Sequence, residues 1–212
     1  MKNQPGMSKK REAIVTIYCL DLEGVLVPEI WIHVAKRFKM KSLEVTTRDI
    51  PDYDKLMRYR IKILKKAGIR LRDIQNVIKR MKPLPGAAAF LERLRGRGPV
   101  IILSDTFYEF AGPLMQQLGR PVLFCNDLII DKKGFIAGYR LRQKDGKGKA
   151  VAGLKKMGFK VAAAGDSYND LTMLRTADRG VLFNPPSSIR KANPRFPVAR
   201  NYAGLFKLVD RR

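Results

Sequence analysis

The sequence predicts an α/β fold: a doubly wound, mainly parallel sheet with a small helical cap domain inserted after the first strand. Apolar segments of strand length alternate along the chain with segments of helical periodicity, as in parallel sheets covered by helices. Residues 13–20 are apolar on both faces, which a strand in the middle of a sheet requires. A helical block at about 30–82 separates this strand from the others. We therefore interpret that block as an inserted cap.

The remaining elements are expected in a regular order. Helical periodicity predicts cap helices over about 51–66 and 71–81. The residues expected to face inward in these helices are Leu56, Ile63, Leu64, Ile74, Val77 and Ile78. After the break at KPLPG, the core is expected to continue as a helix at 87–94, a strand at 99–105, a helix at 108–118, a strand at 121–126, a hairpin at 128–143, a helix at 149–157, a strand at 160–167, a helix at 171–176, a strand at 179–183 and a helical tail. The predicted units are a loose tail at 1–12, a core at 13–29 and 83–212, and the cap at 30–82.

Length and composition suit a globular protein with a sizeable core. The chain has 212 residues, of which 45% are hydrophobic. No apolar run approaches the roughly 20 residues that span a bilayer, and AIVTIYCL has no signal-peptide cleavage site after it. Cys19 and Cys125 lie in apolar runs without CxxC partners, which is typical of buried thiols in a reducing compartment. We therefore expect a cytoplasmic protein with no membrane partner.

The chain is strongly basic, with 43 Lys and Arg residues against 19 Asp and Glu residues and a net charge of +24. Such a charge attracts polyanions and phosphorylated metabolites at low salt. Ten basic residues and one acid lie between 58 and 82. A basic nucleic-acid-binding protein is therefore the non-enzyme alternative. No recognition module or run of interleaved aromatic residues accompanies the charge, so we expect no specific nucleic-acid partner.

Three predicted strands end in polar clusters. These clusters are CLDLEG at Asp21, IILSD at Ser104 and AAAGDSYND at Asp166. Each could be an ordinary strand-end turn. In an open α/β sheet, however, ligands bind beyond the carboxyl ends of the strands, so clusters distant in the sequence meet in one crevice. We therefore expect these three clusters to form one site.

The residue types in these clusters point to phosphoryl transfer. The donors are hard oxygens, and the only histidine is His33, which favours Mg²⁺ over zinc. A carboxylate beside Mg²⁺ can attack phosphorus and form an acyl phosphate. Glu23, two residues after Asp21, points to the same side of an extended backbone, where it can protonate the leaving oxygen. The pair thus supplies two carboxyl groups with different tasks.

The order of these motifs resembles the haloacid dehalogenase superfamily of aspartyl phosphotransferases. The motifs are DxE after a first strand, Ser after a second, a lysine, and then GDxxND. CLDLEGVLVPEIW, TTRDIPDYD, ILSDTFYEF, YRLRQKD and AAGDSYND closely resemble the bacterial phosphoserine phosphatase/homoserine phosphotransferase branch. The likeness runs from about residue 13 to 205. Most relatives have Asp where this chain has Glu23, and phosphoserine phosphatases generally have glycines after the serine where this chain has SDTF. Both differences agree with this branch.

The resemblance implies roles in the core. Asp21 would be the nucleophile, and Glu23 the general acid and base, with its backbone carbonyl a metal ligand. Ser104 and the backbone NH of Asp105 would bind the transferring phosphoryl group. Asp166 would complete the metal site, which thus comprises Asp21, Glu23 and Asp166. Asn169 would lie near the phosphate, and Asp170 would hold metal-bound water or the lysine.

The resemblance also requires a lysine and substrate-binding residues in the cap. Lys147 matches the lysine that opens the helix before the last catalytic strand, with Lys144 and Lys149 as alternatives. Its ammonium group would offset negative charge on Asp21 and the phosphoryl oxygens. Glu29 would pair with the substrate amino group.

The substrate carboxylate requires an arginine, because a planar guanidinium fork suits it. By the resemblance, Arg60 matches the arginine that binds the substrate carboxylate, and Arg58 and Arg48 are rivals. Trp31 and His33 are interpreted as cap-helix packing or surface residues, and Tyr53 as a core residue rather than one that stacks on the substrate.

The branch implies a Mg²⁺-dependent enzyme that takes the phosphoryl group of phosphoserine onto Asp21. Water or the hydroxyl of homoserine would then accept it, and both acceptors stay open. Another small phosphomonoester is the alternative substrate, because cap residues rather than the core set specificity. The expected partners are these small molecules and a second copy of the chain in a homodimer.

Overall fold

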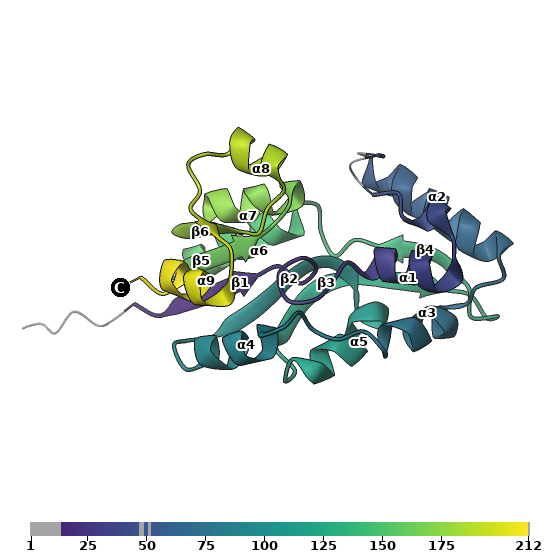
Figure 1. Cartoon of the computed structure of the whole chain (residues 1–212), viewed down its shortest axis with the longest axis horizontal. Helices are drawn as coiled ribbons and strands as arrows, with labels where there is room; N and C mark the ends of the chain where they lie inside the picture. The colour runs from purple at the N-terminus through teal and green to yellow at the C-terminus, as the bar shows by residue number, and fades with distance from the viewer. Residues whose placement is uncertain (1–13, 47–48, 51, 212) are drawn as a thin grey trace, which may run out of the picture.

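The computed structural model describes residues 14–46, 49–50 and 52–211 (Figure 1). The predicted tail at 1–12 and Arg48 lie outside these described residues.

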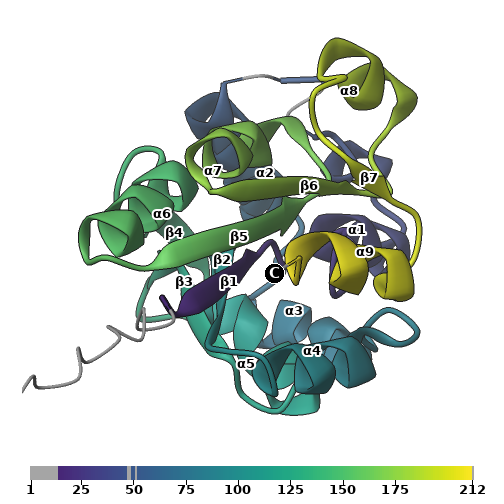
Figure 2. The ribbon, with the colours of Figure 1, turned by 90° about the vertical axis from the view of Figure 1, so that its left-hand side faces the viewer.

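One sheet runs through the molecule (Figures 1 and 2). Within the described residues it has seven strands in the order β4-β3-β2-β1-β5-β6-β7. The strands are β1 (Thr16–Leu20), β2 (Val100–Phe107), β3 (Val122–Ile130), β4 (Ile136–Arg140), β5 (Lys160–Gly165), β6 (Arg179–Phe183) and β7 (Val198–Ala199). Neighbouring strands are parallel except β3 and β4, which form the predicted antiparallel hairpin. The predicted doubly wound α/β fold is confirmed.

Helices cover both faces of the sheet, as Figure 2 shows. The helices are α1 (Ile30–Phe38), α2 (Tyr53–Lys66), α3 (Leu71–Ile78), α4 (Ala87–Arg95), α5 (Tyr108–Gln117), α6 (Gly146–Lys156), α7 (Leu171–Thr176), α8 (Ser187–Ala192) and α9 (Tyr202–Val209), with 3-10 turns η1 (Lys41–Leu43) and η2 (Tyr168–Asp170). Tyr18 and Leu20 belong to the core under α4, α5 and α9, whereas Ile17 and Cys19 belong to the core under α6, α7 and α8. β1 is therefore apolar on both faces because each face is covered.

The helices of the predicted cap pack on the first of these cores. Leu56, Leu64, Ile74 and Ile78 are buried as predicted, while Ile63 and Val77 are partly buried. The apolar residues of α1 and α3 join the same cluster as those of α4 and α5. The division into a core at 13–29 and 83–212 and a cap at 30–82 therefore stays a prediction.

Some predicted boundaries were wrong. α3 ends at Ile78 rather than 81, because the chain turns there and Met81 bonds back to the Ile78 carbonyl. α6 starts three residues earlier than predicted, at Gly146, after Asp145 in the left-handed conformation. The predicted strand at 121–126 and the first arm of the hairpin are one strand, β3. The short strand β7 was not predicted; it adds two residues to the sheet edge beside β6.

The carboxyl ends of β1, β2 and β5 lie side by side. Leu20, the last residue of β1, pairs with Ile102 of β2 on one side and with Ala164 of β5 on the other. After β1 the chain enters the predicted cap. It then forms the strands on one side of β1 (β2, β3 and β4) and later those on the other side (β5, β6 and β7). This is the switch point at which open α/β sheets bind ligands. Among the residues described, we find no helix long and apolar enough to cross a membrane.

Candidate active site

Asp21 and Lys147 form the buried centre of the site. Asp21 follows β1, where its Oδ1 accepts a hydrogen bond from the Leu22 NH at 2.7 Å. Lys147 lies in the first turn of α6, and its Nζ is 2.9 Å from Asp21 Oδ1 and 2.7 Å from Asp170 Oδ1. Burial lowers the pKa of Lys147, but the charges of Asp170 and Asp21 outweigh it and raise this pKa well above its usual value. The lysine is therefore charged and neutralises part of the acidic cluster.

Three carboxylates converge beside this lysine. One oxygen from each of Asp21, Asp166 and Asp170 lies within 4.8 Å of the other two. Burial and the charge of Asp170 raise the pKa of Asp166 to about 7, and burial also raises that of Asp21. Gly24 has φ of 77°, and a Cβ there would be 2.6 Å from Asp166 Cγ. Hard oxygen ligands packed this closely fit a divalent cation such as Mg²⁺, whose charge would offset their repulsion.

Asp170 is fully buried and orders the loop after β5. Its Oδ2 accepts hydrogen bonds from the backbone NH groups of Asp166 and Ser167, each at 3.0 Å. Its Oδ1 accepts from Lys147. Asp170 thus orients both the acidic loop and the lysine, and is compatible with the supporting role predicted for it.

Ser104 and Asp105 lie on a bulge of β2. The pairing with β3 shifts between Leu103 and Phe107, so the strand leaves its neighbour just where Ser104 occurs. Ser104 is buried, and its Oγ accepts from the Thr106 NH at 3.2 Å. The Asp105 carboxylate accepts from Asn169 Nδ2 at 2.6 Å and lies 3.7 Å from Lys147 Nζ. The bulge therefore directs this strand end toward the acids of β1 and β5.

Glu23 is held in a loop that folds back on itself. Its Oε2 accepts from the Ile30 NH at 2.7 Å, at the start of α1. Burial, and then the negative charge of Glu29, raise the pKa of Glu23 to about 8, against the opposing effects of that hydrogen bond and of Arg60. Glu23 is therefore protonated at neutral pH, as a general acid must be.

Arg60 is the buried arginine of the cap. Its Nη2 donates to the Val45 carbonyl at 2.8 Å, and its guanidinium lies 4.5 Å from the Trp31 ring centroid. Its buried Nε has no hydrogen-bond partner among the described residues. Burial lowers the pKa of Arg60 to about 10, which still leaves it charged. A buried cation with a free donor is a natural site for an anionic group of a ligand.

A cavity of about 350 Å³ joins these groups. The predicted site residues that line it are Asp21, Glu23, Glu29, Arg60, Ser104, Asp105, Lys147, Asp166 and Asn169. Asp170 lies behind it, in contact with Lys147. The nucleophile candidate and the lysine are at its core end, whereas Arg60 lies in the predicted cap and Glu29 directly precedes it.

The rival residues occupy different surroundings. Lys144 and Lys149 are exposed, whereas Lys147 is buried among the acids. Arg58 is exposed and pairs with Asp54 at 2.6 Å. Neither of these lysines nor Arg58 lines the small cavity. The surroundings therefore favour Lys147 and Arg60, and their roles stay predictions.

Two aromatic residues have more than the packing role that the sequence suggested. Trp31 packs edge-on against Phe110, with ring centroids 5.5 Å apart, and also lines the cavity beneath Arg60. Tyr53 contacts Tyr139 edge-on and donates a hydrogen bond to the Asp105 carbonyl at 3.2 Å. The available signal was their place within the motifs EIW and DYD, which belong to the segments that resemble the family.

Comparison with known proteins identifies the family of this chain. The family model of haloacid dehalogenase-like hydrolases matches residues 15–178. A phosphoserine phosphatase of Pseudomonas syringae pv. tomato is 53% identical over 196 residues, which cover 92% of this chain and 83% of the relative. The phosphoserine phosphatase ThrH of Pseudomonas aeruginosa is 53% identical over 189 residues, covering 89% of this chain and 92% of the relative.

Solved structures share the fold. A substrate-bound phosphoserine phosphatase complex superposes with a TM-score of 0.77 at 18% identity, covering 94% of this chain and all (100%) of the other. A phospho-aspartyl intermediate analogue of phosphoserine phosphatase gives a TM-score of 0.76 at 19% identity, covering 93% and 100%. The superfamily that the motifs predicted is confirmed: the chain belongs to the haloacid dehalogenase-like hydrolases.

Proposed function

We propose that this protein is a Mg²⁺-dependent phosphoserine phosphatase that can also pass the phosphoryl group to homoserine. The observation that carries the proposal is the 350 Å³ cavity, which joins Asp21 and Lys147 to the charged residues Glu29 and Arg60. Phosphoserine has a phosphate for the first pair, an amino group for Glu29 and a carboxylate for Arg60. The names of the relatives at 53% identity support the same substrate.

In the first step, a carboxylate oxygen of Asp21 attacks phosphorus and the bond from phosphorus to the serine oxygen breaks. Glu23, protonated because its pKa is about 8, gives its proton to the departing oxygen. Ser104 and the charged Lys147 bind the phosphoryl oxygens and stabilise the charge that develops on them. The products of this step are serine and an aspartyl phosphate.

In the second step, the acceptor hydroxyl, from water or from homoserine, gives its proton to the Glu23 carboxylate as its oxygen attacks phosphorus. The bond from phosphorus to the Asp21 oxygen breaks, and the free carboxylate is restored. Inorganic phosphate or phosphohomoserine leaves, and Glu23 is again protonated. Which acceptor is used depends on how completely the cap excludes water during this step.

We assign the cation to the acidic end of the cavity. Asp21, Asp166 and the Glu23 backbone carbonyl would hold Mg²⁺, and Asp170 would orient Lys147 or metal-bound water. The close approach of the Asp21, Asp166 and Asp170 oxygens supports this assignment. Bound Mg²⁺ would supply positive charge that weakens the repulsion between the nucleophile and the phosphate.

The cellular compartment, the oligomeric state and the lack of a specific nucleic-acid partner are also proposals. Cys19 and Cys125 are buried free thiols, which suits a reducing cytoplasm. The resemblance to the branch leads us to propose a homodimer. Of the ten basic residues between 58 and 82, eight are exposed, Arg70 is partly exposed and Arg60 is buried. Arg60 thus belongs to the substrate cavity, and we assign the others no specific nucleic acid.

The first prediction concerns substrate choice. With Mg²⁺, we expect phosphate release from phosphoserine to exceed release from phosphothreonine, phosphotyrosine and sugar phosphates, and added homoserine to yield phosphohomoserine. Chelation of the metal should stop all turnover, because the clustered acids then repel the phosphate. Phosphate release and mass spectrometry of the products provide the readout. Preference for a sugar phosphate would reject the substrate, and metal-independent turnover would reject the cofactor.

The second prediction concerns Glu29 and Arg60. Replacing Arg60 by Ala, or Glu29 by Gln, should lower kcat/KM for phosphoserine by about 10- to 100-fold, because each removes a charged hydrogen bond worth about 1.5–3 kcal/mol. An aryl phosphate has no amino or carboxylate group, so its kcat/KM should change much less. Arg58→Ala is the matched control and should leave both substrates unaffected. Equal losses for both substrates would contradict the assigned roles.

A further inference from the structure

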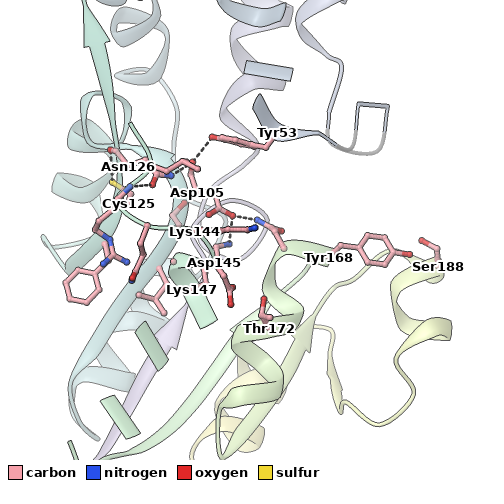
Figure 3. Close-up of a pocket in the computed structure, with 18 residues that line it drawn as sticks. Tyr53, Asp105, Cys125, Asn126, Lys144, Asp145, Lys147, Tyr168, Thr172 and Ser188 are labelled. Carbon is pink, nitrogen blue, oxygen red and sulfur yellow. Dashed lines mark hydrogen bonds and ion pairs between the residues drawn. The ribbon is translucent and has the colours of Figure 1, made fainter. Parts of the chain in front are cut away.

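A second cavity, of about 910 Å³, lies beside the substrate cavity (Figure 3). Residues of β2 and β3 line it, among them Leu103 and Phe124, which pair with each other across the two strands. Leu141 and Arg142, which follow β4, also line it. The site described above uses none of these four residues. This cavity is more than twice the size of the substrate cavity.

Six residues line both cavities and form the partition between them: Tyr53, Ser104, Asp105, Lys147, Tyr168 and Asn169. The contacts of this partition converge on Asp105. Its carbonyl accepts from Tyr53 Oη and from Asn126 Nδ2, each at 3.2 Å. Its carboxylate accepts from Asn169 Nδ2 and faces Lys147. Ser104, Asp105, Lys147 and Asn169 all belong to the proposed phosphoryl end.

Tyr53 is the cap residue of the partition, and Figure 3 shows it reaching from α2 toward Asp105. Its ring packs edge-on against Tyr139 of β4, with centroids 5.6 Å apart, and Tyr139 in turn donates to Asp54 Oδ1 at 2.8 Å. Burial raises the pKa of Tyr53, and Asp105, Arg60 and Glu23 lie close enough to shift it. Tyr53 is thus a positioned residue of the partition, contributed from the cap side, where the alcohol part of the substrate would bind.

We propose that Tyr53 determines the size of the substrate by closing the small cavity against the large one. With the ring in place, the alcohol part of the phosphomonoester is limited to the size of an amino acid. Without it, a bulky alcohol can extend into the large cavity next to Asn126, which shares the Asp105 carbonyl with Tyr53. The inference rests on the proposed function only in taking a phosphomonoester as the substrate.

The test compares a small and a bulky substrate on the same enzyme preparations. We would measure kcat/KM for phosphoserine and for 4-methylumbelliferyl phosphate with Mg²⁺, in the wild type, Tyr53→Ala, Tyr53→Phe and Tyr59→Ala. In Tyr53→Ala the ratio of bulky to small substrate should rise by about 10-fold or more, the scale on which pocket shape discriminates substrates. Because both values come from one preparation, any unfolded fraction cancels in the ratio.

The other two variants separate the ring from its surroundings. Tyr53→Phe keeps the ring and loses only the hydrogen bond to Asp105, so its ratio should stay near that of the wild type. Tyr59 lies on the same helix, is 37% exposed and lines neither cavity, so Tyr59→Ala controls for the loss of a tyrosine from α2. An unchanged ratio in Tyr53→Ala, or an equal rise in Tyr59→Ala, overturns the inference.

The outcome is distinct from that of the proposed function. If the wild type does not hydrolyse phosphoserine, acetyl phosphate serves as the small donor in the same comparison. That result would reject phosphoserine as the substrate, while the ratio in Tyr53→Ala would still decide whether Tyr53 sets the size limit.

Discussion

Asp21→Asn should lose phosphatase activity by a factor on the order of 10⁴ or more, because an amide oxygen cannot replace the carboxylate nucleophile. The fold should remain intact. Burial and the neighbouring acids raise the pKa of Asp21, so its charged form is disfavoured in the folded protein, and an amide of the same shape relieves that repulsion. Lys147 keeps its contact with Asp170 in the variant. We therefore expect the melting temperature in the presence of a chelator to be unchanged or higher.

Steady-state phosphate release, thermal unfolding and trapping of the phosphoenzyme check this prediction. The wild type should carry one acid-stable, hydroxylamine-sensitive phosphoryl group after rapid quenching, and Asp21→Asn should carry none. Asp127→Asn is the matched control: it is half-buried on β3, pairs with Arg140 at 3.6 Å and does not line the substrate cavity. Turnover near the wild-type rate in Asp21→Asn, with its fold preserved, would rule out the nucleophile.

Lys147→Gln should have the second largest effect, lowering kcat by about 10²- to 10³-fold, because the variant loses the buried cation that stabilises charge on the transferring group. It should also lower the free energy of unfolding by about 3–5 kcal/mol in the absence of Mg²⁺. The reason is that Asp21 and Asp170 then remain buried without the cation that contacts both at under 3 Å. Added Mg²⁺ should restore part of this stability, since the cation offsets the same charges.

Lys144→Gln and Lys149→Gln are the matched controls, because they make the same change at exposed positions within three residues. Their free energy of unfolding should change by less than about 0.5 kcal/mol, as for most surface substitutions. Denaturant unfolding with and without Mg²⁺, together with kcat, provides the measurement. A loss of kcat in Lys149→Gln as large as that in Lys147→Gln would mean that the wrong lysine was chosen.

Much of the catalytic end could be predicted because local pattern and sheet geometry together determine it. The apolar run before Asp21 and the AAAG run before Asp166 identify two central strands, and parallel strands present their carboxyl ends at one edge. The convergence of Asp21, Ser104 and Asp166 on one cavity follows from that rule. The bulge at Ser104 could not be predicted from this rule, since it depends on how β2 pairs with β3.

The cap was less predictable because its residues share one local pattern. Arg58 and Arg60 are two residues apart on the same amphipathic helix, yet one pairs with Asp54 at the surface and the other is buried over Trp31. Periodicity states which face of α2 is apolar, but not what lies opposite each position. Tyr53 was interpreted as a packing residue for the same reason: its contact, the Asp105 carbonyl, lies 52 residues further along the chain.

The sequence by itself determined the fold class, most of the succession of helices and strands along the chain, and the acids that end three strands, because alternating apolar segments can be buried in few ways and strand ends carry the polar residues. Only the tertiary structure decided which lysine is buried, which arginine reaches the cavity and where Tyr53 divides one cavity from another. Burial and charge pairing depend on residues far apart in the chain, and the packing of α2 and α6 against the sheet brings those residues together.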